Sequence, residues 1–395
     1  MSRSQPVSAA QTHPHFVLCL AAAVFAQFAI GCQSRNLPLR NSFRATVYIA
    51  GSGSHGGGEL WLLNAIEPQL ERRIRLAARP VALTFNSARD EVYVLERRTR
   101  ELLVLNALNE RVIGRVMLPG SPSAMVLDPG HTYAYVAVNE GSWGQILKIN
   151  LPARAITARL HLAAAPARLA VNDRGNRLLA SDPQNRQLLI IGCSGTELKL
   201  VSKLAMPQGP GKIVTLPYGA QAFVLCPPAN QVAVVNYIQP ALITNLTVGR
   251  APADLALKPD GGELYVSNSG DGTISIIDTS ADNISGLFLT GRDPQGLAVS
   301  RHGRFLYAAN AGSNTVSEFR LSDRSTVAQI PVGLRPSRLA IGPFGLYVFV
   351  QDMGSNDVAV VRPGLGAMLT LLPSAPNASA MRVAAFRVPA KIKLQ

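Results

Sequence analysis

The fold is decided by residues 248–291, which read VGRAPADLALKPDGGELYVSNSGDGTISIIDTSADNISGLFLTG. Four short apolar segments, separated by turn residues, lie at 254–257, 264–268, 273–278 and 285–290. Proline and glycine in the Pro-Asp-Gly-Gly turn pre-set its backbone angles. Strands of about five residues at a regular spacing of about 8–12 residues indicate an all-β sandwich, barrel or propeller.

The same pattern repeats along most of the chain. A proline precedes each first strand, and successive prolines are 42, 44, 44, 42, 42 and 42 residues apart. They are Pro80, Pro122, Pro166, Pro210, Pro252, Pro294 and Pro336. A four-strand period of about 40–45 residues selects the propeller among the all-β folds. The sequence therefore predicts an all-β chain that folds as a β-propeller of four-stranded blades.

The two ends of the repeat region predict how the ring closes. Residues 45–50, 59–63 and 72–76 are typical of a second, third and fourth strand, and residues 378–388 are typical of a first strand. Together they make an eighth blade, which would leave no exposed sheet edge. We expect eight blades. Seven are the alternative if one degenerate copy is absorbed elsewhere.

The N-terminal segment is typical of export. Residues 16–30 form an apolar run of 15 residues, which is short for a membrane-spanning helix of about 20 residues but suits the core of a signal peptide. The run leads into Ala29-Ile30-Gly31-Cys32, which resembles a bacterial lipoprotein signal. The resemblance implies cleavage before Cys32 and lipidation of its thiol. An ordinary secretory signal or an uncleaved anchor is the alternative.

These readings predict four regions: a signal peptide over 1–31, a lipidated Cys32 with a tether over 32–43, one propeller domain over 44–390, and a basic tail over 391–395. Gln33 follows the cysteine in place of the Asp associated with inner-membrane retention. We therefore expect an exported monomer at the periplasmic face of a bacterial membrane, as an outer-membrane lipoprotein that reaches the membrane through its lipid anchor.

Charge and cysteine content limit the partners and cofactors that we expect. The net charge is +14, and no run of five like charges occurs. Scattered arginine fits an anionic surface or polymer, whereas a DNA-binding protein clusters its charge on one element, so nucleic acid is not expected. No CxxCH or CxxC motif occurs, which excludes covalent c-type haem and a CxxC zinc pair. Cys193 and Cys226 are expected to be two buried free thiols; a disulfide between them, in an oxidising compartment, is the alternative.

Two segments carry a family resemblance. LYVSNSGDGTISIID (264–278) closely resembles the YVTN β-propeller repeat, and FLYAANAGSNTVSEF (305–319) is similar. The resemblance covers roughly residues 45–390. It implies that the first strand of each blade is innermost, and that its start shares one face of the ring with the loop between the second and third strands.

That orientation places a set of charged side chains around the mouth of the central channel. Those flanking the repeat prolines are Arg79, Arg250, Arg292, Asp293 and Arg335, and those two residues after a proline are Arg168, Lys212, Asp254 and Arg338. His55, in a glycine-rich loop over 52–58, is expected at the same mouth. Because arginine matches carboxylate and phosphate in shape and charge, the set predicts a basic funnel for an anionic ligand. The alternative is that the arginines pair with neighbouring acids.

A second set of polar residues ends the second strands. It comprises Glu96, Asn139, Asp182, Cys226, Asn268, Asn310 and Asp352. Its Asn and Asp members are expected to cap turns by bonding nearby backbone.

Three functions fit this sequence. The first is a non-enzymatic binding scaffold of the cell envelope, without cofactor, whose partner is an envelope protein or an anionic small molecule or polymer. The second is tetrapyrrole binding or cofactor assembly, because eight-bladed secreted propellers resemble the haem-d domain of nitrite reductases; His55 would then be the axial ligand. The third is a lactonase-like hydrolase, since sugar lactonases share this fold. No catalytic or metal-binding residue is predicted.

Overall fold

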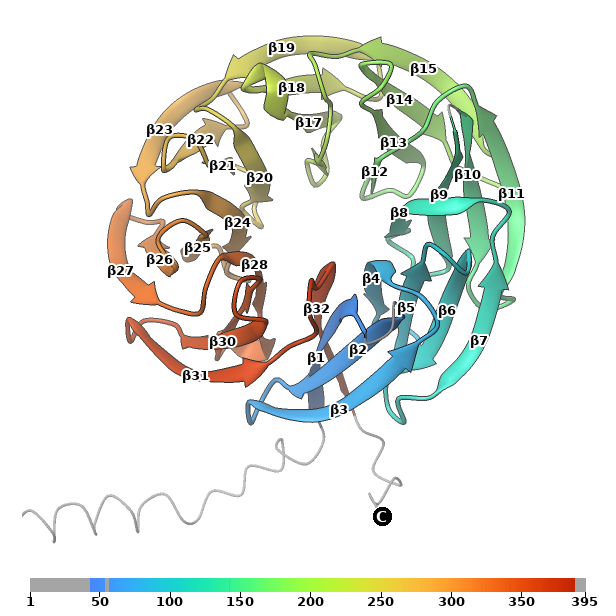
Figure 1. Ribbon diagram of the computed structural model, residues 1–395. Helices are drawn as coiled ribbons and strands as arrows, with labels where there is room; N and C mark the ends of the chain where they lie inside the picture. The colour runs from blue at the N-terminus through green and yellow to red at the C-terminus, as the bar shows by residue number, and fades with distance from the viewer. Residues whose placement is uncertain (1–42, 54–56, 142, 388–395) are drawn as a thin grey trace, which may run out of the picture. The chain divides into compact units, whose positions relative to one another are not determined.

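Eight four-stranded antiparallel sheets surround a common axis in the computed structural model, which describes residues 43–53, 57–141 and 143–387 (Figure 1). Arg44–Phe386 form one compact unit. The prediction of an eight-bladed propeller is confirmed, and the seven-bladed alternative is wrong because both weakest repeats, after Pro122 and Pro210, form complete sheets. The expected signal segment, Cys32, His55 and the basic tail lie outside the described residues.

Blades 1 to 4 follow one another along the chain. Blade 1 contains β4 (Pro80–Asn86), β5 (Glu91–Glu96), β6 (Glu101–Asn106) and β7 (Val112–Met117). Blade 2 contains β8 (Ser121–Leu127), β9 (Tyr133–Glu140), β10 (Trp143–Asn150) and β11 (Ala155–Leu162). Blade 3 contains β12 (Arg168–Val171), β13 (Arg177–Asp182), β14 (Gln187–Gly192) and β15 (Lys199–Ala205). Blade 4 contains β16 (Ile213–Thr215), β17 (Gln221–Cys226), a 3-10 turn (Pro227–Ala229), β18 (Gln231–Asn236) and β19 (Ala241–Thr247).

Blades 5 to 8 complete the ring. Blade 5 contains β20 (Pro252–Leu257), β21 (Glu263–Asn268), β22 (Thr273–Asp278) and β23 (Asn283–Leu289). Blade 6 contains β24 (Pro294–Val299), β25 (Phe305–Asn310), β26 (Thr315–Arg320) and β27 (Ser325–Pro331). Blade 7 contains β28 (Pro336–Ile341), a 3-10 turn (Pro343–Gly345), β29 (Val348–Asp352), β30 (Asp357–Arg362) and β31 (Ala367–Pro373). Blade 8 contains β1 (Phe43–Ser52), β2 (Gly58–Asn64), β3 (Gln69–Leu76) and β32 (Ala380–Arg387).

The hydrophobic pattern explains the radial order of the strands. The two middle strands are buried along almost their whole length, as β21 and β22 show, whereas the fourth strand β23 is mostly exposed and has a single buried residue. Both faces of a middle strand pack against neighbouring blades, so its sequence is a continuous apolar run. First strands surround the axis and fourth strands form the rim (Figure 1).

Blade 8 closes the ring as expected. The order β3-β2-β1-β32 places the C-terminal strand beside the N-terminal one. Ser379 donates its backbone N–H to Ala50 O at 2.7 Å, and its hydroxyl donates to Pro80 O of blade 1 at 2.7 Å. The closing blade therefore joins both ends of the repeat region to each other and to the first full blade.

Side chains also hold neighbouring blades together. In blade 6, Arg324 donates to Glu263 Oε1 and to Ser285 O of blade 5, both at 3.0 Å. It passes over Gly286, where an added Cβ would come within 2.9 Å of the guanidinium. Arg154 of blade 2 lies over Gly114 of blade 1 in the same way. A glycine in a fourth strand thus makes room for an arginine from the next blade.

Two findings bear on the earlier expectations. Cys193 and Cys226 lie in blades 3 and 4, are both buried and are both free thiols, as predicted. No helix within the described ranges has the length and apolar character needed to cross a membrane.

Candidate functional site

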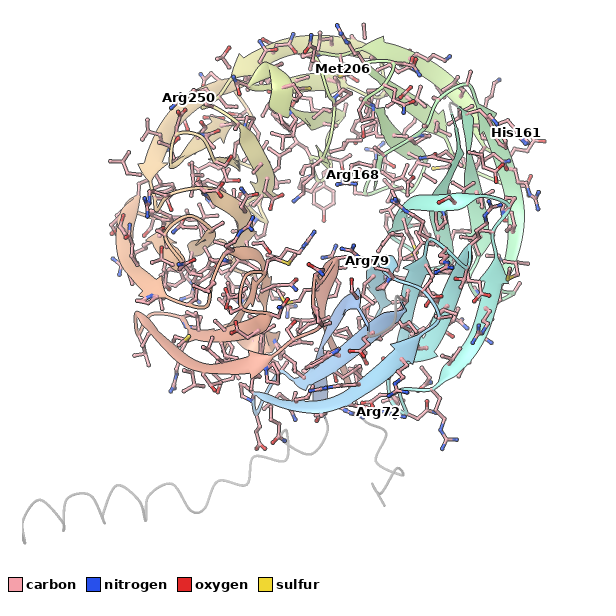
Figure 2. The ribbon with its side chains drawn as sticks, viewed as in Figure 1. Arg72, Arg79, His161, Arg168, Met206 and Arg250 are labelled. Atoms are coloured by element: carbon pink, nitrogen blue, oxygen red, sulfur yellow. The ribbon has the colours of Figure 1, made fainter. Side chains whose placement is uncertain are left out.

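The innermost strands bring a set of cations to the centre of the ring. In blades 3, 5 and 7, the residue two positions after the repeat proline lies opposite the residue that precedes the end of the second strand. This position carries Arg168 in blade 3, Asp254 in blade 5 and Arg338 in blade 7. Figure 2 shows Arg168 at the central opening. These three members of the predicted set therefore share one level of the channel.

A further cation, Arg382, comes from the closing strand β32. The hydroxyl of Ser379 donates to a proline carbonyl of the next blade, as the hydroxyl of Ser123 does. Ser123 directly follows a repeat proline, so Ala378 stands at the proline position of blade 8. Arg382 is four residues after Ala378. Because side chains alternate along a strand, Arg382 lies on the same side of β32 as the residue two positions after Ala378.

Among the residues that the structure describes, no carboxylate lies within ion-pair distance of the three channel arginines. Each guanidinium donates instead to a backbone carbonyl: Arg168 to Ala167 O at 3.1 Å, Arg338 to Ala378 O at 3.2 Å, and Arg382 to Met381 O at 2.9 Å. All three side chains are open to water. Most of their hydrogen-bonding capacity is therefore free for a ligand.

Burial and the neighbouring charges both change the pKa of Arg338. The pKa of Arg338 is lowered first by desolvation within the surrounding ring, and then by repulsion from Arg382 and Arg168, while Asp254 opposes the change. Desolvation also lowers the pKa of Arg382. Because an arginine pKa starts above about 12, the guanidinium groups stay charged. The channel therefore holds like charges whose repulsion Asp254 offsets only in part.

Asp254 is the acid in this cluster, and its carboxylate is already engaged. Its Oδ1 accepts from Lys212 Nζ at 2.5 Å, and its Oδ2 accepts from Leu297 N at 3.0 Å. Lys212 also donates to Leu255 O at 2.8 Å. The ion pair with Asp254 neutralises Lys212. The net positive charge of the cluster therefore comes from the three arginines.

The other predicted mouth residues lie outside this cluster. Arg250 is an exposed residue that pairs with Asp271 of the β21–β22 loop at 2.5 Å, and Arg79 donates to Asn377 O at 3.2 Å. Asp293 and Arg335 have left-handed backbone, with φ of 54° and 53°, in the turns that enter β24 and β28. Arg292 donates its backbone N–H to Ser313 Oγ at 3.2 Å. For Arg250, the observed ion pair agrees with the alternative that the arginines pair with neighbouring acids.

The polar residues that end the second strands bond within their own blades and to neighbouring blades, as Asn139 does by donating to Pro166 O at 3.1 Å. Asn268 donates to Thr273 Oγ1 and Ser275 Oγ at 3.0 and 2.9 Å, and Asn310 makes the equivalent bonds. In blade 7 this position is Asp352, which is buried beside Asp357. Burial, and then contact with Asp357, raise the pKa of Asp352 from 3.8 to about 8. These residues serve the blades rather than the channel.

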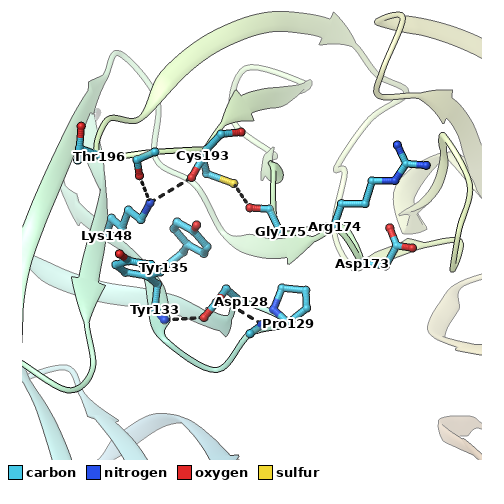
Figure 3. Close-up of a pocket in the computed structure, with 13 residues that line it drawn as sticks. Asp128, Pro129, Tyr133, Tyr135, Lys148, Asp173, Arg174, Gly175, Cys193 and Thr196 are labelled. Atoms are coloured by element: carbon cyan, nitrogen blue, oxygen red, sulfur yellow. Dashed lines mark hydrogen bonds between the residues drawn. The ribbon is translucent and has the colours of Figure 1, made fainter.

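A separate cleft of about 690 Å³ lies between blades 2 and 3 (Figure 3). In it, the buried Lys148 donates to Cys193 O at 3.1 Å and Gly195 O at 2.6 Å, with its ammonium 4.3 Å from the centre of the Tyr133 ring. Burial raises the pKa of the Cys193 thiol, which favours the unreactive protonated form.

The equivalent position in blade 6 is Glu318, which accepts from Gly364 N of the next blade. Both charged residues thus hold the turn of a neighbouring blade. This assigns Lys148 a structural role.

The described part of the chain contains no group of three or more His, Cys, Asp or Glu residues that could hold a metal ion. Sequence reasoning named Arg168, Lys212, Asp254 and Arg338 but missed Arg382. The sequence contained the information needed to find Arg382. Residues 378–388 were recognised as a first strand, and aligning Ala378 with the repeat prolines would have placed Arg382 in the channel.

Comparisons with known proteins agree with the fold. A sequence model of the family described as "Lactonase, 7-bladed beta-propeller" matches residues 195–329, about a third of the chain. A search of curated proteins finds no match. The matched residues span parts of blades 3 to 6 and support the repeat architecture, although the ring has eight blades.

Several solved structures resemble the chain in fold at low sequence identity. Hydrazine synthase from Kuenenia stuttgartiensis has a TM-score of 0.55 and 16% identity, over 72% of this chain and 96% of that chain. A functionally unknown protein from Desulfotomaculum acetoxidans has a TM-score of 0.59 and 14% identity, over 72% and 94%. Dihydro-heme d1 dehydrogenase NirN in complex with DHE has a TM-score of 0.60 and 15% identity, over 73% and 64%. At these identities the likeness concerns the fold alone.

Proposed function

We propose that this protein is a non-enzymatic binding propeller that holds an anionic small molecule, or an anionic group of a larger partner, in its central channel. The observation that carries the proposal is the cluster of Arg168, Arg338 and Arg382. The three arginines are exposed on innermost strands, none has a carboxylate partner among the described residues, and Arg338 is repelled by the other two. A bound carboxylate, phosphate or sulfate group would accept their free N–H donors and remove the repulsion.

The N-terminal sequence supports a location for this function at the cell envelope. The apolar run over 16–30 and the cysteine that follows it favour export and a lipid anchor at Cys32. A single lipidated cysteine carries more than one acyl chain, which suffices for stable anchoring. The propeller would then act at the periplasmic face of a bacterial membrane, where it would present the channel to solutes or to envelope proteins.

The test is ligand-induced stabilisation of the purified protein. Its melting temperature is measured in sodium chloride, sodium sulfate and sodium tripolyphosphate at equal ionic strength. A ligand that binds only the folded state raises this temperature. We expect sulfate and tripolyphosphate to stabilise the protein more than chloride does, and Arg338→Gln to abolish most of that difference.

The matched control is Arg250→Gln, which removes the same charge from an exposed residue outside the channel and should keep the difference. Equal anion effects in wild type, Arg338→Gln and Arg250→Gln would overturn the proposal, since they would mean that anions act on the protein surface in general.

Tetrapyrrole binding is the second candidate. It is favoured by the likeness in fold to NirN, which is described in complex with DHE, and by a basic channel that suits a macrocycle bearing several carboxylates. His131, His161 and His302 lie in turns or in a rim strand, not on an innermost strand, so the described residues offer no axial histidine there. A visible absorption spectrum of the protein from its own host tests this candidate: a Soret-type band would support it, and a featureless spectrum would oppose it.

A further inference from the structure

The cations of the channel lie at two opposite sides of the ring. In a ring of eight blades, blade 3 faces blade 7 and blade 4 faces blade 8. Arg168 of blade 3 therefore faces Arg338 of blade 7 across the axis, and Figure 1 shows β12 and β28 on opposite sides of the opening. Arg382 of blade 8 reinforces the side of Arg338. We name the side of Arg168 the first pole and the side of Arg338 and Arg382 the second pole.

The blades between the two poles carry no unpaired charge at the position two residues after the repeat proline. At the register position of Arg168, blades 1 and 2 have Ala82 and Ala124, and blade 6 has Gly296. In blade 5, Asp254 occupies this position, but its carboxylate is bound to Lys212 and to a backbone N–H. At this register position, free positive charge is thus concentrated at the poles.

We propose that the channel ligand is a two-headed anion that spans the channel, with one anionic group at Arg168, the other at Arg338 and Arg382, and an uncharged spacer between them. The inference rests on the proposed function and specifies the ligand class of the same site. A single anionic group bound at one pole would leave the guanidinium of the other pole without an anionic partner. A molecule with two separated anionic groups would satisfy both poles, and its second contact would form within the complex, at a high effective concentration.

The test uses linear α,ω-dicarboxylates, from succinate to azelate, and the monocarboxylates of the same chain lengths. Binding is measured by isothermal titration calorimetry at fixed ionic strength. We expect an optimum of chain length at which the dicarboxylate binds at least about tenfold more tightly than its monocarboxylate, since a second charged hydrogen-bonded contact is worth a factor of that order.

Variants at each pole decide whether both are used. Arg168→Gln and Arg338→Gln should each reduce the dicarboxylate advantage to nearly one, and the double variant should reduce it no further, because the two sites act through one bridging ligand. Arg250→Gln is the control and should keep the advantage. Thermal unfolding of each variant confirms that it is folded.

Three results would overturn the inference. One is equal binding of dicarboxylates and monocarboxylates, and another is a retained dicarboxylate advantage in Arg168→Gln; with either, anion binding in the channel would still stand. The third is that neither series binds. If neither series binds but sulfate and tripolyphosphate still stabilise the protein, only the two-headed ligand is refuted. If sulfate and tripolyphosphate also fail to stabilise it, the proposed function is refuted as well.

Discussion

Asp352→Asn should stabilise the protein at neutral pH, although it changes a fully buried residue. Asp352 Oδ2 accepts from Gly333 N at 3.1 Å, but its Oδ1 has no hydrogen-bond partner and lies beside the carboxyl group of Asp357. The folded protein therefore keeps a proton on Asp352, whose pKa is raised from 3.8 to about 8. Blades 5 and 6 place asparagine at this position, and an amide nitrogen could donate to Asp357.

The magnitude follows from proton linkage. Because the folded pKa is raised, the stabilising effect of the bound proton is complete below pH 3.8 and is lost as the pH rises toward 8. Across this window each pH unit costs the folded state about 1.4 kcal/mol relative to the unfolded chain. From pH 5 to pH 7.5 the loss is about 3 kcal/mol, and the asparagine variant lacks it. The free energy of unfolding of Asp352→Asn, relative to wild type, should therefore improve by that amount between the two pH values.

The assay is urea-induced unfolding of both proteins at pH 5 and pH 7.5, followed by circular dichroism. Comparing the change between pH values removes the pH-independent effect of the substitution on packing. Asp182→Asn is the matched control in blade 3: there the carboxylate accepts from Asn185 Nδ2 at 2.6 Å and Gln187 Nε2 at 2.8 Å, so the amide should destabilise the protein by about 1–3 kcal/mol. If the effect of Asp352→Asn is the same at both pH values, the argument for a retained proton is refuted.

Three further predictions concern charge and packing. Arg382→Gln should raise the melting temperature of the ligand-free protein in low salt, because it removes repulsion from Arg338, and the gain should shrink in about 1 M salt, where the Debye length is only about 3 Å; a gain that is independent of salt would contradict this. Lys148→Met should lower the free energy of unfolding by about 1–3 kcal/mol, since the carbonyls of Cys193 and Gly195 lose their donor, and urea unfolding that shows no loss would refute the structural role of Lys148. Gly286→Ala should displace Arg324 from Ser285 O and speed proteolysis between blades 5 and 6, whereas Ala281→Gly, at an exposed turn nearby, should not.

The sequence was sufficient for the fold because its repeat is regular. Prolines 42 or 44 residues apart and buried middle strands predict both the number of blades and the closing strands, since each blade obeys the same local pattern. Even the short strand β16, with three residues, lies where the period places it. The left-handed backbone at Asp293 and Arg335 was not predicted, because neither residue type requires that conformation.

The candidate site was predicted less well, because side-chain direction depends on position within the blade. Arg250 and Arg338 lie two residues before and two residues after a repeat proline, so spacing alone did not distinguish them. One is on an exposed turn and meets Asp271, and the other is on an innermost strand and faces the channel. The opposition of Arg168 to Arg338 is a property of the closed ring, which brings together residues 170 positions apart in the sequence.

The pairing of β32 with β1 also has a consequence for folding. The hydroxyl of Ser379 donates to the carbonyl of Ala50, 329 residues earlier in the chain. Contacts between residues so distant in sequence close late, because a long loop must be ordered before they form. Until β32 docks, blade 8 has three strands, β1 keeps an unpaired edge, and Arg382 is absent from the channel. The strand β32 therefore completes both the ring and the proposed binding site, so a chain truncated before residue 380 should be unable to bind the ligand even if its first seven blades have formed.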